Sequence, residues 1–175
     1  MSDAAGLRHI GLEPQSGCLL GRVHRLPIRV YYEDTDAGGI VYYANYLKFM
    51  ERGRSDMLRL AGIDQVVLMK PGDGAEPLMF VIRRCEVDYL RPARLDDRIV
   101  VETRLVEWSG ARLDMEQTIR REDDLLVTAR IHAAVVGSAG RARRLPPKIR
   151  HILTALVCSA DAAGEPVAGG LDRTM

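Results

Sequence analysis

Three carboxylates crowd into four consecutive positions near the start of the chain, at Glu33, Asp34 and Asp36. Gly38 and Gly39 follow them and allow backbone angles and close approaches that side chains would forbid. A carboxylate on such a bend could attack a carbonyl carbon or activate a water molecule that does so. The alternative is that these acids only cap a helix, satisfy the turn or face solvent, since Asp is a favoured turn and cap residue.

A strand before this bend and a helix after it would position the carboxylates. Residues 26–32 are predicted to form a strand, and residues from 46 onward a helix that ends near Gly62. The helix is predicted from apolar or small residues at helical spacing, namely Tyr46, Phe49, Met50, Gly53, Met57 and Leu60. Because the first amides of a helix have no partner within it, a carbonyl oxygen placed there would be polarised as negative charge develops on it.

The stretch at 31–42, YYEDTDAGGIVY, resembles the hotdog-fold acyl-CoA thioesterases, as do NY at 45–46 and ER at 51–52. The resemblance continues through YLRPARLDD at 89–97 and covers roughly residues 26–148. The members most similar to it are the 4-hydroxybenzoyl-CoA thioesterase type and the Tol-Pal-associated branch. The resemblance implies hydrolysis of a thioester to free acid and CoA, with no cofactor.

Two site residues follow from the resemblance. The second Asp of the family's Asp-Thr-Asp run is the catalytic carboxylate, which is Asp36 here. The backbone amide seven positions later holds the thioester carbonyl in that family, and here it belongs to Tyr43. Many members of the Tol-Pal branch have His at this position. Tyr43 keeps the backbone N–H donor, but it cannot perform any function that a His side chain has there.

A second hypothesis comes from a different class, because hotdog domains also host dehydratases and binding roles. In this alternative the chain is a non-catalytic acyl-CoA or acyl-carrier-protein binding module of a cell-envelope assembly. Asp36 on its glycine turn favours the enzyme, because a mere binder needs no carboxylate beside a thioester.

The rest of the chain predicts an α+β hotdog fold, a curved antiparallel β-sheet wrapped around one long central α-helix. Long strands joined by short polar turns are expected after residue 78, and such turns favour antiparallel pairing. A glycine at position 53 costs helix stability, so it indicates a close contact with the sheet or a partner. The open edge of the sheet is expected to pair in a homodimer, and the resemblance extends this to a homotetramer.

The densest positive cluster follows the last strand and contains Arg141, Arg143 and Arg144. Arginines at a pocket mouth would hold the phosphates of CoA through charge-assisted bonds. The alternative is a solvated basic tail.

Composition limits the other possibilities. The net charge of +1 gives no reason to expect nucleic-acid binding, and three widely spaced cysteines suggest neither disulfides nor a metal site. No apolar run is long enough to span a membrane and no signal core is present, which predicts a cytoplasmic protein. The expected organisation is a flexible N-terminal arm at 1–22, a hotdog domain at 23–150 and a loose tail at 151–175. His9 and His24 are expected at the surface, not as ligands.

Overall fold

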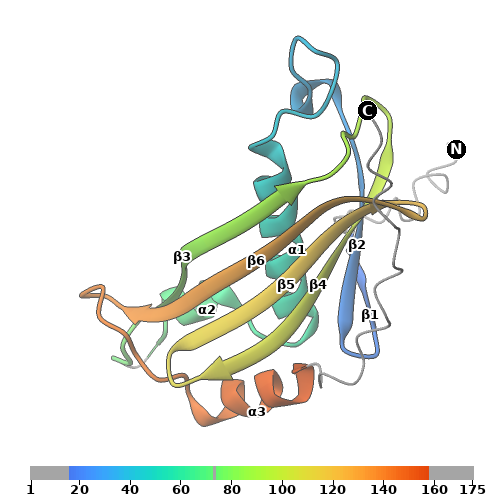
Figure 1. Cartoon of the computed structure of the whole chain (residues 1–175). Helices are drawn as coiled ribbons and strands as arrows, with labels where there is room; N and C mark the ends of the chain where they lie inside the picture. Colours follow the sequence, from blue (N-terminus) through green and yellow to red (C-terminus); the bar gives the residue numbers. More distant parts are fainter. Residues whose placement is uncertain (1–15, 73, 158–175) are drawn as a thin grey trace, which may run out of the picture.

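The computed structural model describes residues 16–72 and 74–157. Six strands form one antiparallel sheet: β1 (Cys18–Leu20), β2 (Val23–Arg29), β3 (Leu78–Tyr89), β4 (Arg98–Ser109), β5 (Arg112–Arg121) and β6 (Asp124–Gly137). The helices are η1, a 3-10 turn (Tyr32–Asp34), α1 (Asn45–Leu60), α2 (Gln65–Met69) and α3 (Pro147–Leu156). The order across the sheet is β1-β2-β4-β5-β6-β3, so β1 and β3 form its two edges (Figure 1). The sheet does not close, and the predicted α+β hotdog fold is confirmed.

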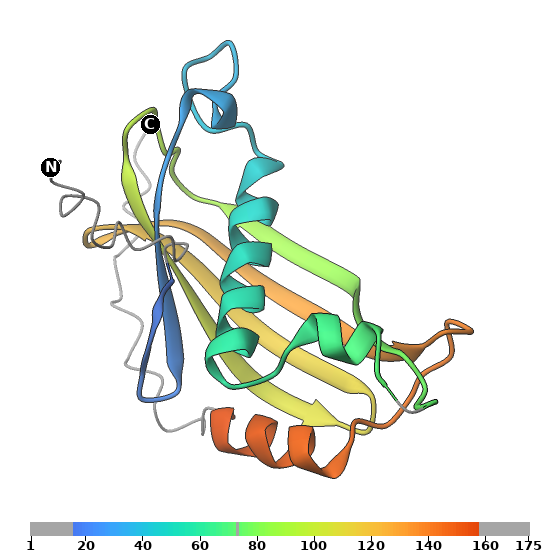
Figure 2. The ribbon, with the colours of Figure 1, turned by 180° about the vertical axis from the view of Figure 1, so that it is seen from behind.

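Helix α1 crosses one face of the curved sheet (Figure 2). Phe49, Met50 and Met57 are fully buried on its inner side, as the helical spacing predicted. A Cβ atom at Gly53 would lie 3.0 Å from Val101 Cγ1, which is tighter than normal packing allows. The glycine therefore lets α1 approach β4 closely, and the predicted contact with the sheet is confirmed.

The strand before the bend is shorter than predicted. β2 ends at Arg29, and the chain then turns into η1 instead of continuing as a strand to residue 32. The Asp34 carboxylate accepts a hydrogen bond from the Tyr31 amide at 2.8 Å, which satisfies a backbone donor that a longer strand would have paired. The Asp34 side chain thus competes with strand pairing for this backbone donor, which explains why β2 is shorter than predicted.

The predicted domain boundaries differ from the structure in two places. Residues 18–20, assigned to the N-terminal arm, pair with β2 as strand β1. The predicted boundary at residue 150 falls inside α3, whose Leu153 and Leu156 are buried, so the tail cannot begin at 151. β1 is joined to the sheet by backbone pairing with β2, whereas α3 packs against β4 through its buried apolar side chains. The remainder of the predicted arm and tail, including His9, lies outside the described residues.

His24 was expected at the surface, and this expectation is wrong. Its side chain is completely buried, and its Nε2 lies 2.9 Å from Asp56 Oδ2. The same carboxylate accepts hydrogen bonds from the Gly17 amide at 2.8 Å and the Ser16 hydroxyl at 2.9 Å, and it pairs with Arg59 at 3.0 Å. Asp56 thus ties the first residues of the described chain and β2 to helix α1.

The hydrogen bonds at Asp56 set its protonation behaviour. Burial raises the pKa of this carboxyl, but the bonds from the Gly17 amide, His24 and Ser16 outweigh burial, and the net pKa is lowered. A carboxyl group whose pKa is lower in the folded than in the unfolded protein stabilises the fold at pH values above its unfolded-state pKa. That stabilisation is lost as the pH falls through the lower, folded-state pKa.

Asp56→Asn should therefore lower the free energy of unfolding at neutral pH by about 2–3 kcal/mol, because charged hydrogen bonds to a buried carboxylate are removed. Urea denaturation followed by circular dichroism would measure it. The difference from the parent should shrink as the pH falls below about 4, the unfolded-state pKa, and should disappear below the lower, folded-state pKa. Asp123→Asn, on an exposed turn, is the matched control. Equal stability of all three proteins at neutral pH would contradict the role assigned to Asp56.

Candidate active site

The chain forms a tight hairpin-like turn at Asp36. Thr35 and Val41 face each other in an antiparallel bridge, and the Asp36 amide donates to the Ile40 carbonyl at 2.9 Å. Gly39 has a φ of 71°, in the left-handed region, which a residue with a side chain adopts only with strain. The turn therefore depends on glycine at this position, as the sequence indicated.

The carboxylate of Asp36 is exposed at this turn. Its Oδ1 accepts a hydrogen bond from the Gly38 amide at 2.8 Å, which fixes the orientation of the side chain. Among the described residues, no partner contacts Oδ2. One oxygen is thus anchored while the other is available to a substrate or a water molecule.

Asp34, two residues earlier, has a structural role. It is buried, and besides capping η1 its backbone carbonyl accepts from the Tyr42 amide and from Asn45 Nδ2, each at 2.9 Å. These bonds join the turn to the first residue of α1. The alternative that an acid of this cluster only supports the turn is therefore correct for Asp34.

The start of α1 presents unpaired donors. Ala44 occupies the N-cap position and supplies no side-chain acceptor, and the first turn of the helix contains no acidic residue. Within residues 16–72 and 74–157, the Tyr43 amide has no hydrogen-bond acceptor. An N–H group at the positive end of a helix dipole and without a partner is a ready site for a developing oxyanion.

A shallow, mostly apolar groove of about 230 Å³ lies beside this amide. Its walls are formed by Ile40, Val41, Tyr43, Tyr46, Tyr89, Leu90, Arg91 and Pro92. The Tyr89 hydroxyl donates to the Tyr43 carbonyl at 3.2 Å, so the end of β3 is joined to the residue that carries the free amide. The sequence reasoning did not identify Tyr46, Tyr89 or Arg91 as groove residues, although all three lie within the stretches that carried the family resemblance.

Two tyrosines of the groove, Tyr46 and Tyr89, and the neighbouring Tyr42 have raised pKa values. Burial raises the pKa of Tyr46 and of Tyr89. The pKa of the neighbouring Tyr42 is also raised, mainly by its hydrogen bond to the Tyr43 hydroxyl, with a smaller contribution from the charge of Asp36. The hydroxyls of Tyr42, Tyr46 and Tyr89 therefore stay protonated near neutral pH and can donate hydrogen bonds.

Within a single chain, the predicted arginines do not lie at this site. Arg141, Arg143 and Arg144 follow β6 and lie at the opposite end of the strands from the turn at Asp36 (Figures 1 and 2). The Arg143 guanidinium is paired with Glu76 at 2.6 Å. Within a single chain β6 runs away from the turn, so the expectation that the cluster lines the pocket mouth stays a prediction.

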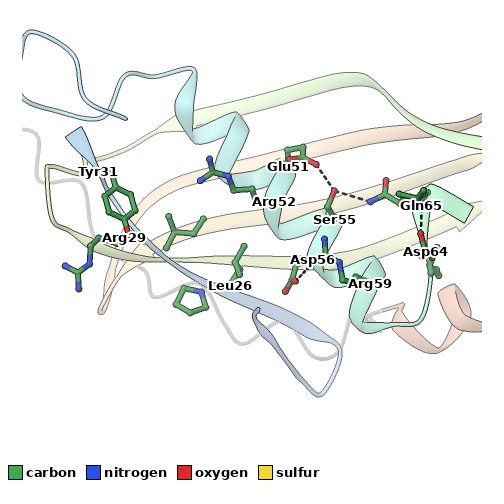
Figure 3. A pocket seen from close by; sticks show the side chains of 14 residues that line it. Leu26, Arg29, Tyr31, Glu51, Arg52, Ser55, Asp56, Arg59, Asp64 and Gln65 are labelled. Carbon is green, nitrogen blue, oxygen red and sulfur yellow. Dashed lines mark hydrogen bonds and ion pairs between the residues drawn. The ribbon is translucent and has the colours of Figure 1, made fainter. Parts of the chain in front are cut away.

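A second cavity, of about 700 Å³, lies between β2 and α1 (Figure 3). Several polar groups of this cavity are already paired with one another. Ser55 donates to Glu51 at 2.6 Å and accepts from Gln65 at 3.1 Å, and Arg59 pairs with Asp56. Tyr43 lines the groove and does not line this cavity, whereas Asp36 lines neither of them.

The described part of the chain holds neither a candidate metal site nor a candidate membrane-spanning helix. It contains no group of three or more His, Cys, Asp or Glu side chains arranged to hold a metal ion. No helix in it is both long enough and apolar enough to cross a membrane.

The family is shown by comparison with known proteins. The model of the thioesterase-like superfamily matches residues 30–153. The chain belongs to this superfamily, which confirms the prediction of a thioester hydrolase.

Individual relatives agree with this assignment. The chain is 42% identical over 125 residues to the acyl-CoA thioester hydrolase YbgC of Escherichia coli O6:H1, a match that covers 71% of this chain and 90% of that protein. It is 43% identical over 110 residues to the acyl-CoA thioesterase YbgC of Haemophilus influenzae, covering 63% of this chain and 78% of the other. A probable thioesterase from Bartonella henselae superposes with a TM-score of 0.68 at 43% identity, covering 71% of this chain and 99% of that structure.

Tyr46 gives a test of how the groove is held together. Its buried hydroxyl accepts a hydrogen bond from the Ala93 amide at 2.8 Å. Tyr46→Phe would leave this amide unpaired and should lower the free energy of unfolding by about 1–3 kcal/mol. Thermal and urea denaturation would measure the change, with the exposed Tyr32→Phe as control. A Tyr46→Phe protein as stable as the parent would show that the amide finds another acceptor.

Proposed function

We propose that the protein is an acyl-CoA thioesterase that hydrolyses its substrate at the turn of Asp36. The observation that supports this most strongly is the pairing of an exposed, oriented carboxylate with the unpartnered Tyr43 amide at the start of α1. A thioester needs a group to attack or activate water and a donor for the oxygen of the tetrahedral intermediate. The two YbgC relatives are named as acyl-CoA thioester hydrolase and acyl-CoA thioesterase, which supports the choice of substrate class.

In the proposed reaction, the Tyr43 amide and the Asp36 carboxylate have separate roles. The Tyr43 N–H donates to the thioester oxygen, which gains negative charge as the carbonyl carbon is attacked. Asp36 either takes a proton from the attacking water or attacks the carbon itself, forming an anhydride that water then opens. The carbon–sulfur bond breaks, and the products are the free acid and the thiol of CoA. Both routes require the charged form of Asp36.

We further propose that the working unit is a homodimer or a homotetramer. β3 is an edge strand, and an unpaired edge favours association with a second copy. In antiparallel pairing of two β3 strands, the Tyr89 end of one copy lies beside the Leu78 end of the other. Since Leu78 pairs with Gly137, that arrangement would carry the partner's basic cluster toward the groove. This is the geometry in which Arg141, Arg143 and Arg144 could hold the CoA phosphates.

Several finer assignments stay predictions. These are membership of the 4-hydroxybenzoyl-CoA type, the Tol-Pal-associated branch, interaction with an acyl-carrier protein and the cytoplasmic location. The acyl group itself is also open, because a groove of about 230 Å³ lined by three tyrosines admits aromatic and short aliphatic groups alike.

Asp36→Asn tests the carboxylate directly. The substitution keeps the shape and the bond to Gly38 but removes the charge, and general-base assistance is typically worth about 10²–10⁴ in rate. The kcat for release of CoA thiol should fall at least that far, while the melting temperature stays near that of the parent. A panel of acyl-CoA substrates assayed for free thiol would supply the rates.

The control for this variant is Glu33→Gln, which neutralises an exposed acid on the same segment and should leave kcat within a few-fold of the parent. Asp34→Asn is unsuitable, because Asp34 supports the turn. Near-normal turnover by folded Asp36→Asn protein would contradict the mechanism. Tight binding of acyl-CoA with no thiol release by the parent would favour the non-catalytic binding module instead.

The basic cluster has its own test. Neutralising Arg141, Arg143 and Arg144 together should raise KM for acyl-CoA more than it lowers kcat, because phosphate contacts lie far from the reacting carbonyl. The effect should disappear with an acyl-pantetheine, which lacks the nucleotide. Glu76→Gln controls for loss of the ion pair at Arg143. Equal losses on both substrates would mean that the cluster acts on folding or assembly.

A further inference from the structure

A small cavity of about 110 Å³ lies between α1 and the sheet, separate from the groove at Tyr43. Its walls are mainly apolar and include Met57, Phe80, Leu105, Met115 and Leu153. These side chains come from α1, three strands and α3, so the cavity is enclosed by elements far apart in the sequence. Arg54 is the cationic residue among those that line it.

Arg54 is held rigidly at this cavity. Its Nη1 donates to Gln117 Oε1 at 2.7 Å. Gln117 is itself buried, and its Nε2 donates to the Met50 carbonyl at 2.9 Å and to Thr103 Oγ1 at 2.8 Å. The amide oxygen of Gln117 therefore has a fixed position, and the guanidinium bound to it is oriented before any ligand arrives.

Among the described residues Arg54 has no ion-pair partner, although the charge of the more distant Glu51 favours its charged form. Within those residues no carboxylate lies within ion-pair distance of it, and Gln117 accepts from one of its five N–H groups. Burial lowers the pKa of Arg54, which reports the loss of solvent around the charge. Arg54 is partly buried, and its remaining N–H donors have no acceptor among the described residues, so they are available to an acceptor from outside the chain.

Glu51 is the negative group nearest in the lining of the cavity. Its carboxylate is exposed to solvent and accepts from the Ser55 hydroxyl at 2.6 Å, so its charge is screened. An anion in direct contact with Arg54 would gain more from the guanidinium than it loses to Glu51.

We propose that this cavity is a binding site for small carboxylic acids, with the carboxylate on Arg54 and the apolar body between Met57, Leu105 and Leu153. An apolar cavity of about 150 Å³ accommodates benzene, and this one is smaller at about 110 Å³, so its apolar part takes a group no larger than a single ring or a short branched chain. A guanidinium and a carboxylate match in a planar, two-bond geometry. The ligand class is that of the acid released by thioester hydrolysis, but binding here needs no hydrolysis and goes beyond the proposed function.

The site is not the catalytic groove of the same chain. Arg54 lies nine residues after Asn45, which corresponds to about 13 Å along the helix. None of the residues that line the groove lines this cavity. An acid bound at Arg54 and a substrate carbonyl at Tyr43 would therefore occupy different places on one chain.

Isothermal titration calorimetry with benzoate and 3-methylbutanoate tests the proposal without an assay of turnover. Both acids should bind the parent protein, whereas benzamide and the bulkier 1-naphthoate should bind at least ten-fold more weakly. Arg54→Gln should weaken benzoate binding roughly 10- to 100-fold, the value of a charged hydrogen-bonded contact. Glu51→Gln should tighten it, because a like charge is removed.

The matched control is Arg52→Gln, an exposed arginine on the same helix that lies over the Phe49 ring and outside this cavity. It should bind benzoate as the parent does, and so should Asp36→Asn, which separates this site from the reaction. Circular dichroism would verify that each variant is folded. Three results would each overturn the proposal. They are no binding of either acid at millimolar concentration, equal binding of benzamide and benzoate, and unchanged benzoate binding by folded Arg54→Gln.

Discussion

Two hydrogen bonds at Ala93 hold the candidate active site together. The Ala93 carbonyl accepts from the Val41 amide at 2.8 Å, and its own amide donates to the Tyr46 hydroxyl at the same distance. Since Ala93 is fully buried between β3 and β4, these bonds join the turn of Asp36 and the start of α1 to the sheet.

Much of the fold followed from local signals in the sequence. The helical spacing from Tyr46, the glycine cap at position 62 and the polar turns after residue 108 each predicted an element that the structure contains. Gly53 also predicted the contact between helix and sheet. These features depend on neighbours in the sequence and on simple periodicity, which is why they could be recognised without a structure.

The failures concern contacts between distant residues. Asp56 and His24 are 32 positions apart, and nothing in the local pattern indicates that a His near the N-terminus is buried against that carboxylate. Within one chain the direction of β6 also separates the basic cluster from Asp36, so its place at the pocket mouth stays a prediction. At the site, the sequence identified Asp36 and Tyr43 through the family resemblance, whereas the enclosing tyrosines and the structural role of Asp34 required the three-dimensional arrangement.

The central claim is that a substrate carbonyl lies between the Asp36 carboxylate and the Tyr43 amide. A crystal structure with an acyl-CoA analogue in which a methylene group replaces the thioester sulfur would test it directly. The account predicts the ketone oxygen about 2.7–3.1 Å from the Tyr43 nitrogen, with the Asp36 carboxylate facing the carbonyl carbon. A carbonyl bound elsewhere, such as in the cavity between β2 and α1, would contradict the account.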